Sequence, residues 1–324
     1  MAFMPDNVAD SWYRAPPPPE SAIDAPDRSS ASLSPGAPSR RLVRVPWRDR
    51  AGRFSPFKAA VFVALFLPGL DLFYDYFRGA LGARPLNELI HGTGLWAIRL
   101  LLISLAITPL RQILRRPELV TIRRMIGVGA FAYAVLHFTL FIVDSNFRPW
   151  FIVSEIVLRL YLTIGFVTFL ALLALAMTST DAMVRRLGGK RWQQLHWAVY
   201  PAGVLAVAHH LMQTKLNVAE ATVYAGLFAW LMGYRLLARG SGAMPGVLRL
   251  ALLSLAVTAL TVGGEALGFR LFTGIDWRRV LQANWVLVGE RPGWVVLFAG
   301  SAVTLLAACR PLWTRSSSSR RSPS

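Results

Sequence analysis

Three histidines lie inside long apolar stretches, where ionisable side chains are costly and usually serve a function. His137 lies in RMIGVGAFAYAVLHFTLFIV, and His196 and His209 lie thirteen residues apart in QQLHWAVYPAGVLAVAHHLM. Imidazole is a common protein ligand for haem iron, and two facing helices can hold a haem between them. This pattern favours a membrane protein that binds b-type haem and carries electrons across the bilayer.

The composition indicates an integral membrane protein. Of 324 residues, 54% are hydrophobic and only 16% are charged, with a mean hydropathy of +0.45. A water-soluble domain of this length could not bury so much apolar surface. The net charge of +18 comes from arginine clusters between apolar runs, which is typical of membrane topology signals rather than of a nucleic-acid site.

The single cysteine, Cys309, excludes an intrachain disulfide and a cysteine-ligated cluster. The sequence has no CxxCH, so a haem would be held without covalent attachment.

Eight apolar segments predict an all-α fold. The first 52 residues precede them as a basic tail rich in proline, serine and alanine, which is expected to be disordered. The predicted segments are roughly 57–70, 95–110, 125–143, 162–178, 195–213, 219–237, 247–264 and 294–309. Several are shorter than the ~20 residues of a straight membrane span, and flanking aromatic and arginine side chains can extend them.

The distribution of basic residues predicts the orientation. Alternate loops and the two ends carry 23 lysines and arginines, whereas the remaining loops carry nine. The positive-inside rule therefore places both termini in the cytoplasm. The loop between the last two segments departs from the trend, because it holds four of the nine.

The predicted orientation places two histidines at one depth. His137 follows Arg124 by thirteen residues, and His209 follows His196 by the same number, which is about 20 Å along a helix in each case. His137 and His209 would then approach one haem iron from opposite faces. A lone histidine at membrane depth is more often a polar contact between helices, so the matched depth is what favours haem.

The cytoplasmic side lacks a matching second pair. Arg123 and Arg124 occupy the level of His196, and arginine is not an ordinary iron ligand because it stays protonated. Arginine suits haem propionates or a flavin phosphate. His196 therefore either binds a second haem with an unusual partner or has another role.

Periodicity does not choose between His209 and His210. In a continuous helix, His209 lies about 140° from the face of His196, whereas His210 lies only about 40° from it. Pro201 lies between them and can kink the helix and shift this phase.

Two further polar residues have open interpretations. His91 is either a polar residue that marks the start of a helix or part of a cofactor or quinone site. Arg99 either contacts a haem propionate or extends toward the membrane interface.

No Rossmann GxGxxG or Walker motif is present, and the glycine-rich stretch at 240–246 is a loop. No catalytic substrate site is evident. Electrons would come from a quinone or a separate protein and pass to a separate partner.

Five stretches carry a resemblance to a known family. They are ITPLR at 107–111, RRMIGVGAFAYAVLH at 123–137, RLYLTIG at 159–165, LAMTSTDAMVRRLGGKRWQQLHWAVY at 175–200 and VLAVAHH at 204–210. Together they resemble the MsrQ family, also called YedZ, within the wider ferric-reductase-like transmembrane group. Members are haem-binding membrane subunits of the bacterial periplasmic methionine sulfoxide reductase system.

The resemblance implies an electron-transfer subunit in the bacterial inner membrane. It implies haem b, one or two per chain, and FMN, with electrons coming from the quinone pool or a cytosolic flavin reductase. The acceptor would be a periplasmic molybdopterin subunit, MsrP-like, that repairs oxidised methionines in envelope proteins. The family's haem positions fall on His137, His196 and His209, which favours His209 over His210.

The resemblance also sets the expected domains. The family core has six segments, so we expect a disordered basic cytoplasmic tail at 1–52, a six-helix haem-binding bundle at 53–240, and an extension at 241–324 with two more transmembrane helices. Lipid would surround the protein.

Two other functions are compatible with parts of the pattern. One is a stand-alone transmembrane ferric or quinone reductase of the same fold, whose acceptor is not a protein. The other is a transporter that relays protons through its histidines. A proton relay favours aspartate or glutamate at membrane depth, and the apolar segments between 95 and 237 contain almost none.

Overall fold

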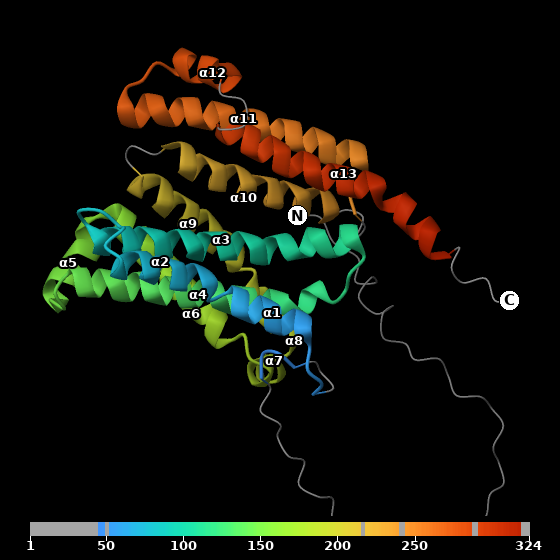
Figure 1. Ribbon diagram of the computed structural model, residues 1–324, viewed down its shortest axis with the longest axis horizontal. Coiled ribbons are helices and arrows are strands. Elements are labelled where there is room, and N and C mark those ends of the chain that lie inside the picture. The colour runs from blue at the N-terminus through green and yellow to red at the C-terminus, as the bar shows by residue number, and fades with distance from the viewer. Residues whose placement is uncertain (1–44, 49–51, 215–217, 240–243, 287–290, 319–324) are drawn as a thin grey trace, which may run out of the picture. The chain divides into compact units, whose positions relative to one another are not determined.

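The computed structural model describes residues 45–48, 52–214, 218–239, 244–286 and 291–318, with side chains as far as residue 310. The predicted disorder of the tail at 1–52 falls almost wholly outside these ranges. Within them, every regular element is a helix (Figure 1). An isolated bridge between Arg48 and Phe54 is the nearest approach to sheet structure in the described part.

Seven helical stretches in the described residues are long and apolar enough to cross a membrane. They match seven of the eight predicted segments and confirm the all-α membrane fold. The first stretch combines two helices with a break between them. The seven are α1 (Pro56–Ala64) with α2 (Leu67–Phe77), α3 (Pro85–Leu114), α4 (Leu119–Asp144), α6 (Leu160–Met177), α10 (Val218–Arg239), α11 (Val247–Thr273) and α13 (Pro292–Ser318).

Shorter helices connect the long ones. They are α5 (Pro149–Leu158), α7 (Asp181–Leu187), α8 (Gly189–His196), α9 (Val199–Gln213) and α12 (Trp277–Val286). α5 lies where α4 ends and α6 begins, and α7 and α8 lie between α6 and α9. We therefore call the two ends of the bundle the α5 end and the α7 end.

Proline determines where two helices break. The predicted segment at 195–213 is two helices, because α8 ends at His196 and α9 begins at Val199. Pro201 has no N–H and its ring collides with the carbonyl four residues earlier, at Trp197, so the regular helix is interrupted there. Pro68 has the same relation to Ala64, the last residue of α1.

A third proline leaves α3 unbroken. Pro109 lies inside α3 and cannot donate to the carbonyl of Leu105. The Arg235 guanidinium, from α10, donates to that carbonyl at 2.6 Å. An arginine on a neighbouring helix thus satisfies the acceptor that proline leaves open, and it ties α3 to α10.

Two apolar clusters form the core, and α3 contributes to both. One cluster joins α3, α4, α6 and α9 and includes Leu101, Ile126, Leu172 and Ala202. The other joins α3, α9, α10, α11 and α13 and includes Leu105, Tyr234, Leu250 and Val296. Figure 1 shows α10 between α3 on one side and α11 with α13 on the other. The C-terminal helices therefore pack against α10.

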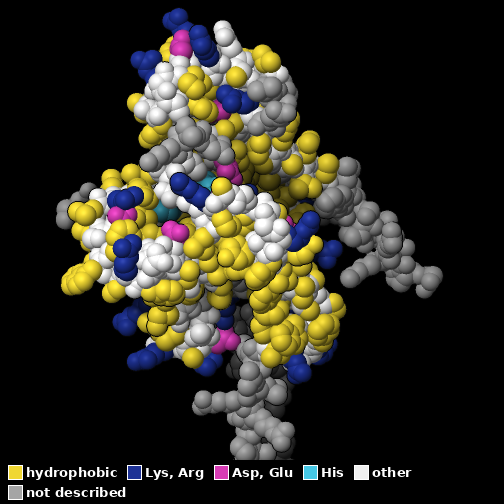
Figure 2. Space-filling model, turned by 60° about the vertical axis from the view of Figure 1, so that its left-hand side comes forward, with side chains coloured by type: hydrophobic (Ala, Val, Ile, Leu, Met, Phe, Trp, Pro, Cys, Tyr) yellow, Lys and Arg dark blue, Asp and Glu magenta, His cyan; other side chains and the backbone are white. Residues whose placement is uncertain are grey.

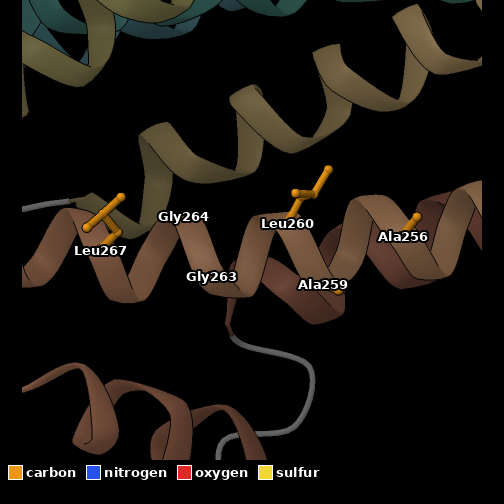
Figure 3. A pocket seen from close by; sticks show the side chains of 6 residues that line it. All are labelled: Ala256, Ala259, Leu260, Gly263, Gly264 and Leu267. Atoms are coloured by element: carbon orange, nitrogen blue, oxygen red, sulfur yellow. The ribbon is translucent and has the colours of Figure 1, made fainter.

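The outward faces of the long helices are apolar, as lipid contact requires. On α11, small and apolar side chains line a shallow surface pocket (Figure 3), formed by Ala256, Ala259, Leu260, Gly263, Gly264 and Leu267. Four polar residues of this extension are buried: Ser254, Thr261, Glu265 and Asn284. Glu265 is fully buried, accepts a hydrogen bond from Asn284 at 3.0 Å, and lies 3.5 Å from the Arg291 guanidinium.

Candidate functional site

His137 on α4 and His209 on α9 face each other near the α5 end. Their ring centroids are 6.3 Å apart, and the ring planes are nearly perpendicular, at 83°. The two helices belong to one four-helix cluster with α3 and α6. The structure thus brings together the pair that the matched-depth argument predicts.

Each of these imidazoles is oriented by a backbone carbonyl. His137 Nδ1 lies 2.7 Å from the Ile90 carbonyl oxygen on α3, and His209 Nδ1 lies 2.7 Å from the Tyr161 carbonyl oxygen on α6. A carbonyl oxygen only accepts, so each Nδ1 carries the proton and donates it. The other ring nitrogen, Nε2, then carries the lone pair that a metal ligand needs. Sequence reasoning missed both carbonyls, because a backbone acceptor has no signature in residue type.

The spacing of the pair fits a six-coordinate metal between the rings. A bond from a metal to imidazole nitrogen is about 2.0–2.1 Å, and the nitrogen lies roughly 1.2 Å from its ring centroid, so a metal held between two opposite imidazoles places the centroids about 6.5 Å apart. The measured 6.3 Å agrees. The pair offers two imidazole donors, and no group of three or more His, Cys, Asp or Glu in the described residues could hold a metal ion. Two such donors suit haem, whose porphyrin supplies the other ligands.

His210 faces away from this pair. Its ring centroid lies 6.1 Å from that of His91 on α3 and 5.5 Å from that of Tyr224 on α10. His210 Nε2 is buried and has no hydrogen-bond partner among the described residues. The structure therefore separates the two neighbouring histidines into two environments, with His209 opposite His137.

A polar cluster surrounds His91 and His210 at the α5 end. The Arg99 guanidinium donates to the Tyr224 hydroxyl at 2.7 Å and lies 3.7 Å from the Glu220 carboxylate. His91 Nε2 lies 4.0 Å from the same carboxylate. Histidine side chains are visible beside acidic and basic ones on the face in Figure 2. Arg99 thus has a carboxylate partner within the chain, whereas the sequence left open that it meets a haem propionate.

His196 lies toward the α7 end and has no second imidazole beside it. Its Nε2 lies 3.2 Å from the Ser179 hydroxyl, its Nδ1 lies 3.0 Å from the Trp192 carbonyl oxygen, and its ring stacks on Trp192 at 3.9 Å. The other four histidines of the chain lie at the α5 end. The residues around His196 therefore do not fit a second haem held by two imidazoles.

The two predicted arginines differ in their partners. Arg124 forms an ion pair with Asp181 at 2.6 Å, whereas no ion pair or hydrogen bond joins Arg123 to another described residue. Both lie close enough to His196 to act on it. Burial lowers the pKa of His196, the hydrogen bond to the Trp192 carbonyl opposes this, and the charges of Arg123 and Arg124 lower it further. These effects together favour the neutral form of the His196 imidazole.

Arg235 adds a positive charge close to Arg123, and sequence reasoning did not single it out. It lies near Arg123, and its guanidinium lies 5.5 Å from the centroid of the Tyr200 ring. The position of Arg235 inside an apolar helix could have identified it as a candidate functional residue from sequence, since an arginine at membrane depth needs specific partners.

Comparisons with known proteins agree with this arrangement. The family model described as "Ferric reductase like transmembrane component" matches residues 93–207, which include His137 and His196 and end two residues before His209. The heme-binding subunit MsrQ of protein-methionine-sulfoxide reductase from Xanthomonas campestris pv. campestris (strain 8004) is 45% identical over 180 residues, covering 55% of this chain and 82% of the relative.

The chain belongs to the MsrQ family. The MsrQ protein of Rhodospirillum rubrum is 42% identical over 190 residues, covering 58% of this chain and 89% of the relative. That of Xanthomonas axonopodis pv. citri (strain 306) is 46% identical over 157 residues, or 72% of the relative. No solved structure matches this chain. Membership of the MsrQ family confirms the resemblance predicted from the sequence.

Proposed function

We propose that this chain is the haem-binding, electron-transfer subunit of a protein-methionine-sulfoxide reductase. The observation that carries the proposal is the His137–His209 pair, whose rings are spaced for one metal and whose Nδ1 atoms are both engaged by carbonyls. The names of its relatives, which describe heme-binding subunits, support it.

The residues of the chain bind and orient the group. Nε2 of His137 and Nε2 of His209 would hold the haem iron, and the carbonyls of Ile90 and Tyr161 orient the two rings. Apolar side chains of the α3–α4–α6–α9 cluster exclude water from the surroundings of the pair. Haem held between two imidazoles supplies one-electron transfer without an open position for substrate. The pair supports one haem b, and His196 then serves another purpose than bis-imidazole ligation.

The α7 end is the proposed site of electron entry. Arg123 has no carboxylate partner in the described residues, and with Arg235 and His196 it makes a basic region suited to an anionic group such as a flavin phosphate. An FMN at this end rests on the resemblance to the family. The donor would be the quinone pool or a cytosolic flavin reductase.

The α5 end is the proposed site of electron exit. With both termini in the cytoplasm of a bacterium, this end faces the periplasm, where an MsrP-like molybdopterin subunit would accept electrons. The His137–His209 pair lies toward this end, since His137 is seven residues before the end of α4.

A stand-alone ferric or quinone reductase is the second candidate function. The polar cluster of His91, Arg99 and Glu220 at the α5 end is the observation that favours it.

Reconstitution of the purified chain tests the proposal. We expect a reduced-minus-oxidised spectrum of a low-spin b haem at one haem per chain. In vesicles with a quinol or a flavin reductase as donor, we expect reduction of an added MsrP-like subunit. A chain that shows no haem spectrum would contradict the proposal and favour the proton-relay reading. Rapid reduction of ferric chelates without any partner would favour the stand-alone reductase.

A further inference from the structure

Two glycines lie directly against the two facing imidazoles. A Cβ added at Gly94, on α3, would lie 3.0 Å from both Nδ1 and Cε1 of His137. A Cβ added at Gly165, on α6, would lie 2.7 Å from both Nδ1 and Cε1 of His209. Non-bonded heavy atoms are normally about 3.5–4.0 Å apart, so a methyl group fits at neither position without displacing the ring.

Each glycine is four residues after the carbonyl that its histidine contacts. Gly94 follows Ile90, and Gly165 follows Tyr161, by one α-helical hydrogen-bond step. The imidazole therefore lies in the space of the missing side chain and donates to the carbonyl one turn earlier. The glycine and the residue that supplies the carbonyl lie on the same face of the helix. A Cβ at the glycine would therefore push the ring away from that face and break its hydrogen bond to the carbonyl.

The arrangement occurs twice in the chain with nearly the same spacing. Ile90 and His137 are 47 residues apart, and Tyr161 and His209 are 48 residues apart. The second helix of each pair carries the same local pattern, Ala-Val-x-His, at 134–137 and at 206–209. Seven residues before each histidine is a fully buried alanine, Ala130 at 0% and Ala202 at 1% exposure. The helix pairs α3–α4 and α6–α9 thus hold their histidines in the same way, against a glycine and the carbonyl one turn before it.

We propose that Gly94 and Gly165 are positioning residues that hold the two imidazoles at their observed angle and distance, in which they would ligate one haem iron. The inference rests on the proposed function, because it concerns how the chain presents His137 and His209 to haem iron. Each glycine acts through its histidine and touches no substrate. In this arrangement the two ring planes are nearly perpendicular, at 83°.

Ferric haem in the purified full-length protein provides the direct test. The orientation of the imidazole planes sets the orbital that holds the unpaired electron, so nearly perpendicular planes give a low-spin electron paramagnetic resonance signal with a large maximum g-value. We expect Gly94→Ala and Gly165→Ala each to shift that signal or convert part of the iron to high spin. Gly165→Ala should do so more strongly, because its Cβ makes the closer contact.

Gly127→Ala is the matched control. Gly127 lies on α4, and its added Cβ would meet only the Ser104 hydroxyl at 3.5 Å, an ordinary contact. It reports the general effect of replacing a helical glycine with alanine, which favours the helix. Its resonance signal should match that of the unaltered protein.

The outcomes separate the inference from the proposed function. Wild-type signals from both Gly94→Ala and Gly165→Ala would overturn the inference, while leaving the haem subunit in place. Absence of a bis-imidazole signal in the unaltered protein would instead remove the proposed function. Loss of haem from a variant that still purifies as a monodisperse protein supports the inference. If Gly165→Ala does not accumulate, Gly94→Ala decides, because its contact is the milder one.

Discussion

At the scale of single residues, two neighbouring arginines at the α7 end have different electrostatic roles. Arg124 is partly exposed and is paired with Asp181. Such surface pairs contribute about 0–1 kcal/mol to stability. Arg123 has no such partner among the described residues, and it lies near His196 and Arg235. The unpaired charge is therefore the one available to an anionic ligand.

The first prediction follows from this difference. Arg123→Gln should weaken retention of an anionic cofactor at the α7 end roughly tenfold, the value of one charge-assisted contact of about 1.4 kcal/mol. Arg124→Gln should have a much smaller effect. Cofactor content of the purified variants and the rate of electron entry from a cytosolic donor are the measurements. Equal and unchanged values for both variants would rule out an anion site at Arg123.

At the scale of elements, proline and arginine together shape the contact between α3 and α10. Pro109 leaves the Leu105 carbonyl without its helical donor, and Arg235 donates to it at 2.6 Å. Arg235 also donates to the Leu231 carbonyl in its own helix at 2.8 Å. Arg235 is thus held in place by two backbone carbonyls. One of them, that of Leu105, is free to accept from Arg235 because Pro109 has no N–H to donate to it.

The second prediction is a coupling between these two positions. Arg235→Leu should lower the free energy of unfolding by about 1–3 kcal/mol, because a buried carbonyl loses its donor. Adding Pro109→Ala should recover part of that loss, since an alanine N–H can donate to Leu105. Unfolding in mixed micelles measures the double-mutant cycle, with the exposed Arg249→Leu as control. Strictly additive effects would contradict the coupling.

The elements also show what sequence alone could predict. Length and apolarity were enough to find seven of the membrane-spanning stretches, because lipid imposes both. The orientation of His209 was not predictable from periodicity. The phase counted from His196 assumed one helix, and Pro201 interrupts it at Trp197, so the 140° argument does not carry past the break.

The candidate site was predictable in its histidines but not in its contacts. Histidine at positions 137 and 209 indicates candidate metal ligands from residue type alone. The contacts of these rings with the carbonyls of Ile90 and Tyr161 depend on which helices pack side by side, which the sequence does not show. Likewise, the sequence shows Arg99 only as a cation at membrane depth. The structure shows that it donates to the Tyr224 hydroxyl and lies 3.7 Å from the Glu220 carboxylate.

At the scale of the whole molecule, the arrangement places a candidate redox pair near one end of a membrane bundle and a basic region near the other. His196 is the last residue of α8, whereas His209 lies thirteen residues later, near the end of α9. The direction of electron flow then depends on which end faces the cytoplasm. The distribution of 23 against nine basic residues predicts that the α7 end does.

The third prediction is therefore about topology. Reporter fusions at Met1 and at Ser324 should both indicate the cytoplasm, and a reporter in the 145–148 turn before α5 should indicate the periplasm. A periplasmic result for Ser324 alone would mean that α11 and α13 do not both cross the membrane. Two reversed termini would invert the proposed electron path while leaving the site geometry unchanged.

The haem content and spin state of three single variants test the central claim most directly. His137→Ala and His209→Ala should each lose haem or leave it five-coordinate and high-spin, because each removes one axial imidazole. His210→Ala should keep a low-spin haem, because its ring faces His91 and Tyr224 instead. Membranes that contain each variant, examined by absorption and resonance spectra, give the answer. Loss of the haem from His210→Ala together with its retention in His209→Ala would contradict the account.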